Sequence, residues 1–60
     1  MKAQNMTFEA YKQAVRYGLI KESDIKEAER LMKEYEPDFR TFYDDGWSVG
    51  GTIAAILMGY

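Results

Sequence analysis

The last fifteen residues, Gly46 to Tyr60, carry no charged side chain, although the chain has eight basic and ten acidic residues before them. A segment that is apolar on all sides is normally buried on all sides. As a helix it would be about 22 Å long, and the hydrocarbon core of a bilayer is about 30 Å thick, so we do not expect it to span a membrane. The rest of the chain, a second copy, another protein or a lipid surface therefore has to cover it.

The length and composition of the chain limit how it can be stabilised. Sixty residues form at most one domain, and a domain this small buries only about 60% of the surface of its unfolded chain. The absence of cysteine rules out disulfides and favours a reducing compartment, so we expect a cytoplasmic protein. Hydrophobic residues make up 47% of the chain, enough for a core. We expect residues 1–6 to be flexible and residues 7–60 to form one helical domain.

Two amphipathic helices are predicted in the first half of the chain. Residues 7–17 place Phe8, Tyr11 and Val15 on one helical face, and Gly18 is expected to end that helix in a left-handed conformation. Residues 25–35 form the second helix, with Asp24 or Ser23 as the N-cap. Its apolar stripe consists of Ile25, Ala28, Leu31, Met32 and Tyr35.

The second half of the chain predicts two further helices. Pro37 suits the first turn of a helix that ends near Asp45, and Gly46 is a natural stop. Ser48 is a natural N-cap for a helix through the tail, although a strand over residues 52–58 stays open. The fold class is therefore predicted to be all-α, a compact bundle of three to four short helices with a central apolar C-terminal helix.

The tail helix has one bulky and one small-residue face. The bulky face holds Val49, Thr52, Ile53, Ile56, Leu57 and Tyr60, and the small face holds Gly50, Gly51, Ala54, Ala55 and Gly59. Small residues at four-residue spacing let a second backbone come close. The bulky face is expected to pack on the other helices, and the small face can be core or a protein interface. The predicted interface comprises Tyr43, Trp47, Gly50, Gly51, Ala54, Ala55 and Met58.

The chain offers little for catalysis or metal binding. It has no histidine, no cysteine and only two serines, both at predicted helix starts where capping explains them. Asp44 and Asp45 lack the alternating oxygen ligands of a calcium loop. We therefore expect no enzyme, no cofactor and no metal. The favoured interpretation is a small regulator or inhibitor that binds another protein and forms a homodimer through the tail.

Two other classes of function stay open. Lys12 and Arg16 are one helical turn apart and Lys21 could lie near them, so the three could contact nucleic-acid phosphates, although a net charge of −2 disfavours this. The run from Gly46 to Leu57 resembles the helix–turn–helix opening Gly-x-Ser-x-x-x-Ile-Ala-x-x-Leu-Gly, with one extra residue before Ile53. That resemblance implies a DNA-binding regulator. A peptide active at a membrane surface is the second alternative, but the tail lacks the expected basic face.

Overall fold

Four helices make up the regular structure of residues 6–59, the part of the chain that the computed structural model describes. They are α1 (Phe8–Glu22), α2 (Ile25–Glu34), α3 (Glu36–Asp44) and α4 (Val49–Leu57). No strand occurs in this range, so residues 52–58 are not a strand and the predicted all-α class is confirmed. Residues 1–5, which are predicted to be flexible, lie outside the described residues. So does Tyr60, which is predicted on the bulky face of the tail helix.

The helix starts follow local sequence signals. The side chain of Thr7 accepts a hydrogen bond from the amide of Ala10, and Asp24 accepts one from Glu27. Each cap satisfies one of the amides that the first helical turn leaves without a partner. Ser48 caps α4 in the same way, and Pro37 lies in the first turn of α3, where its missing N–H costs nothing.

The predicted end of the first helix at Gly18 is wrong. α1 continues to Glu22, and Ser23 closes it by donating its hydroxyl to the carbonyl oxygen of Leu19. Gly18 keeps helical geometry and serves packing instead: a Cβ there would overlap Cδ1 of Ile53 and lie 3.2 Å from its Cγ1. The stop predicted at Gly46 is confirmed, since φ there is +83° and the chain turns between α3 and α4.

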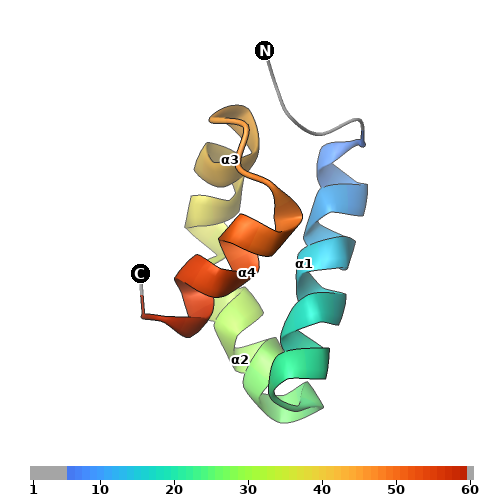
Figure 1. Cartoon of the computed structure of the whole chain (residues 1–60), viewed down its shortest axis with the longest axis vertical. Coiled ribbons are helices and arrows are strands. Elements are labelled where there is room, and N and C mark those ends of the chain that lie inside the picture. The colour runs from blue at the N-terminus through green and yellow to red at the C-terminus, as the bar shows by residue number, and fades with distance from the viewer. Residues whose placement is uncertain (1–5, 60) are drawn as a thin grey trace.

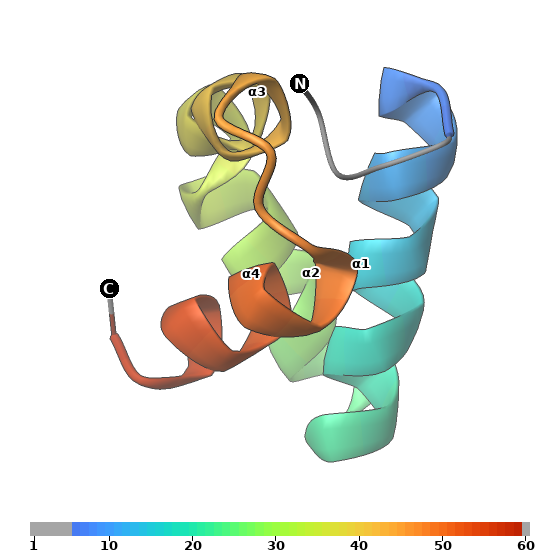
Figure 2. The same ribbon diagram turned by 45° about the horizontal axis from the view of Figure 1, so that its top comes forward.

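The longest helix, α1, is the element that all the others contact. Tyr11, Val15 and Leu19, spaced by four residues, are fully buried along one face of it. This spacing keeps their side chains in one row. Figures 1 and 2 show α2 returning beside α1, α3 continuing beyond the end of α2, and α4 lying across the face that these helices leave. The buried residues that complete the core are Ala28, Leu31, Phe39, Phe42 and Ile56.

The C-terminal helix is fixed to α1 by one polar and one apolar contact. Tyr11 and Thr52, both fully buried, share a hydrogen bond between their hydroxyl groups. The next residue of α4, Ile53, lies against Gly18, about two turns after Tyr11 on α1. Thr52 and Ile56 of the bulky side are buried as predicted, but Leu57, predicted on the same side, is exposed. The helix covers one face of the bundle and is not enclosed by it.

The overall dimensions are those of a self-contained small protein. The radius of gyration is 10.5 Å, and about 10 Å is expected for sixty residues. The accessible surface is 4040 Å², and about 4,000 Å² is expected for a compact monomer of 7.0 kDa. A single copy of the chain is therefore as compact as a monomer of this size is expected to be.

Candidate functional site

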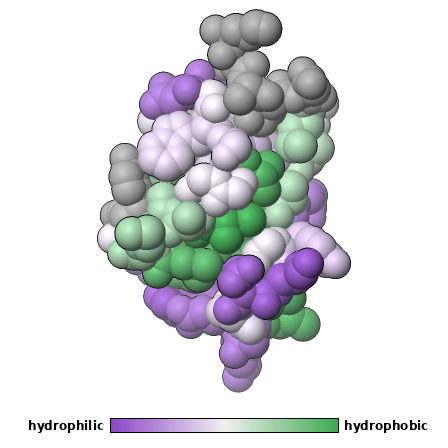
Figure 3. All heavy atoms as spheres, viewed as in Figure 1, coloured by the Kyte–Doolittle hydropathy of each residue, from purple (hydrophilic) through white to green (hydrophobic). Residues whose placement is uncertain are grey.

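The open side of α4 is an apolar surface. Met58 is 84% exposed and Leu57 42% exposed, although both are large and hydrophobic. The small residues Gly50, Gly51 and Ala54 are exposed beside them, and Ala55 is half-buried. Figure 3 shows hydrophobic atoms across the middle of this face and hydrophilic atoms below them. Because α4 has no charged residue, nothing on this side resists burial against a protein.

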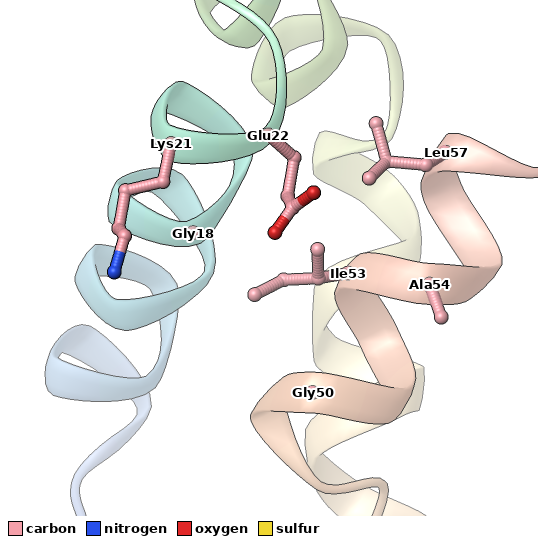
Figure 4. A pocket seen from close by; sticks show the side chains of 7 residues that line it. All are labelled: Gly18, Lys21, Glu22, Gly50, Ile53, Ala54 and Leu57. Atoms are coloured by element: carbon pink, nitrogen blue, oxygen red, sulfur yellow. The ribbon is translucent and has the colours of Figure 1, made fainter.

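A groove runs between this side of α4 and the last turns of α1. Its volume is about 390 Å³. The residues that line it are Gly18, Lys21, Glu22, Gly50, Ile53, Ala54 and Leu57. Figure 4 shows the carboxylate of Glu22 turned into the groove toward Ile53, and the Lys21 side chain directed along α1 and away from α4. The groove is open beside Gly50, where an added Cβ would meet no atom within 4 Å.

The two aromatic residues predicted for the interface are half-buried and pack against the core. The ring of Trp47 lies 4.9 Å, centroid to centroid, from that of Phe42. Tyr43 packs against Phe8 at 5.3 Å and Tyr11 at 5.2 Å, and its hydroxyl donates a 2.6 Å hydrogen bond to the carbonyl of Met6. Both side chains are half-buried. The structure thus gathers the predicted α4 residues on one side and separates Tyr43 from them, with Trp47 near Gly51 at the start of the helix.

The three basic residues considered for nucleic acid do not form one patch. Lys12 makes a 3.4 Å ion pair with Glu36, and Arg16 pairs with Glu29 of α2. Lys21 is nine residues beyond Lys12 on the same continuous helix, which places the two on opposite sides of it at 100° per residue. Two of the three cations are thus neutralised by neighbouring helices, and the third borders the groove.

The serine hydroxyls and the Tyr11 phenol have structural partners. Both serine hydroxyls are engaged at helix ends, Ser23 with a carbonyl of α1 and Ser48 with the amide of Gly51. Burial raises the pKa of the Tyr11 phenol, and its hydrogen bond with Thr52 lowers it in part. Between residues 6 and 59, no three acidic side chains gather closely enough to hold a metal ion.

Glu22 and Gly18 are the groove residues that sequence reasoning missed. The signal was present, because the residues after Gly18 are good helix formers up to the caps at Ser23 and Asp24. A helix continued to Glu22 would have brought Lys21 and Glu22 onto the same element as Gly18. Their position beside α4, however, depends on a contact between distant parts of the chain.

Comparison with protein-family models, with curated proteins and with solved structures finds no match. None of the helices in the described range has the length and apolar character needed to cross a membrane. Candidate functions for this chain therefore rest on its own surface.

Proposed function

We propose that this protein is a small, non-enzymatic protein-binding module that acts as a regulator or inhibitor and self-associates through the open side of α4. The observation that carries the proposal is the exposure of Leu57 and Met58 beside a row of small residues on an uncharged helix. Burying a large apolar side chain fully contributes about 1.5–3 kcal/mol. The small residues add the possibility of close backbone contact with the partner.

Three features support binding rather than catalysis. The chain has neither histidine nor cysteine, so the commonest acid–base and nucleophilic groups are missing. Both serines are engaged in capping. The groove beside α4 has an apolar floor and only one carboxylate turned into it. The lack of cysteine also supports the proposal that the protein works in the cytoplasm.

The mass of the protein in solution tests self-association. We expect light scattering to give the monomer mass of 7.0 kDa at low concentration and a rise toward twice that mass at high micromolar concentration. Ala54→Glu places a charge on the exposed side of α4 and is expected to keep the protein monomeric while the far-ultraviolet circular dichroism stays helical. Ala10→Glu, at an exposed alanine of α1, is the matched control and is expected to associate like the wild type.

Two results would count against the proposal. A wild-type mass of 7.0 kDa at every concentration removes self-association. If Ala54→Glu and Ala10→Glu lose association equally, the contact between copies does not depend on α4.

A further inference from the structure

The groove between α1 and α4 has a mostly apolar lining, so a molecule that binds there has to fill it with apolar groups. Ile53 forms its floor, Leu57 and Ala54 form one wall, and the glycines at positions 18 and 50 leave room for close approach. Tyr17, 66% exposed, lies on α1 one turn before Lys21, whose Nζ is 5.8 Å from the centre of its ring. An exposed aromatic at the edge of an apolar hollow is a favoured anchor in protein interfaces.

The electrostatics of the groove restrict the occupant further. The Glu22 carboxylate points into the groove, and no cation among residues 6–59 pairs with it. An occupant that covers this carboxylate removes it from water, and an unpaired buried charge is strongly unfavourable. The occupant therefore has to bring a basic side chain to Glu22 together with its apolar surface.

A second copy of the chain supplies such a side chain. Lys21 is the only basic residue that lines the groove, and it cannot pair with Glu22 of its own chain, because adjacent helical residues do not face each other. In a two-fold symmetric contact, any pair between one residue and its partner is made twice. We propose that two copies meet groove to groove, with Lys21 of each copy paired with Glu22 of the other. This inference rests on the proposed self-association and assigns its polar contacts.

The contact area that a dimer needs requires residues of α1 as well as α4. A standard interface takes about 800 Å² from each partner, about a fifth of the 4040 Å² surface of this chain. The nine residues of α4 are about 14 Å long and the helix is about 10 Å wide, so one side of α4 is too small alone. Adding Tyr17, Lys21 and Glu22 enlarges the contact, and a weak, reversible dimer is expected.

Charge reversal within the pair tests the proposal on the intact protein. Lys21→Glu and Glu22→Lys are each expected to weaken dimerisation by about tenfold or more in sedimentation equilibrium at low salt, since each puts like charges together. The double variant K21E/E22K restores opposite charges across the two-fold axis, and its dissociation constant is expected to return to within about threefold of wild type.

Controls with the same net-charge changes separate a specific pair from general repulsion. Lys33→Glu and Asp45→Lys alter exposed residues outside the groove and are expected to leave the dissociation constant within about twofold. Circular dichroism confirms that each variant is folded. If wild type dimerises but the single reversals have no effect, or the double variant does not recover, the groove pairing is overturned while self-association stands. If wild type is monomeric throughout, both proposals fall.

Discussion

Gly18→Ala tests the contact on which the position of α4 depends. An added Cβ at residue 18 overlaps Cδ1 of Ile53 and comes within 3.2 Å of Cγ1. At Gly50, in contrast, an added Cβ meets nothing within 4 Å, so Gly50→Ala is a control for the helical effect of alanine alone. Both positions lie inside helices, in α1 and α4 respectively.

Two opposing effects determine how much Gly18→Ala changes the free energy of unfolding. Replacing glycine by alanine inside a helix contributes about 0.8–1 kcal/mol to stability. Overpacking a contact costs about 1–3 kcal/mol, so Gly18→Ala is expected to lower the free energy of unfolding by up to about 2 kcal/mol. Gly50→Ala is expected to raise it by about 0.8–1 kcal/mol, because only the helical effect acts there.

A second variant identifies the atom responsible. Ile53→Val removes Cδ1, the atom that an added Cβ at residue 18 would overlap. In that background the Cβ only approaches Cγ1 at 3.2 Å, and a small shift of the shortened side chain at residue 53 relieves that contact. The alanine is then expected to be stabilising by about 0.5–1 kcal/mol relative to Ile53→Val alone. A reversal of sign between the two backgrounds is the signature of a direct contact.

Urea denaturation followed by far-ultraviolet circular dichroism measures these differences. A domain of sixty residues has about 3–9 kcal/mol of total stability, so changes of 1 kcal/mol are readily resolved. If Gly18→Ala stabilises the protein as much as Gly50→Ala in the wild-type background, α1 and α4 do not meet at Ile53. The groove derived from that packing would then be wrong as well.

Three further predictions concern the core. Tyr11→Phe and Thr52→Val each leave one buried hydroxyl without its partner and are expected to cost about 1–3 kcal/mol, whereas the double variant costs less than their sum, as thermal or urea unfolding will show. Because burial raises the folded-state pKa of Tyr11 above its unfolded value near 10, its contribution is full below that pH and is lost as the pH rises through the folded-state pKa. Stability measured above pH 10 is therefore expected to fall more steeply in wild type than in Tyr11→Phe. Trp47→Ala removes the ring against Phe42 and is expected to cost about 3 kcal/mol in urea unfolding; an unchanged midpoint contradicts a packing role.

Local signals in the sequence predict where the helices begin. Thr7, Asp24 and Ser48 each accept a hydrogen bond from the amide three residues ahead, so each helix start depends only on adjacent sequence. Gly46 ends α3 because its positive φ is a local requirement of the turn. The all-α fold followed from these boundaries together with the apolar periodicity between them.

Features set by tertiary contacts could not be predicted in the same way. Gly18 resembles a helix stop, but Ile53 from a distant helix requires its small size, so α1 continues past it. Ile25 belongs to the predicted apolar stripe of α2, yet it is 61% exposed, whereas Ala28, three residues further in the same stripe, is fully buried. The groove at Glu22 arises from the same long-range packing.

Concentration-dependent amide chemical shifts test the central claim most directly, because they report which residues meet a second copy. On dilution from about 1 mM to about 10 µM, the range suited to a weak interface, we expect shifts at the groove and α4 amides, with little change on α2. The reporting residues are Gly18, Glu22, Gly50, Ala54 and Met58. Spectra that do not change, or changes confined to residues far from α4 such as Lys33, contradict the account.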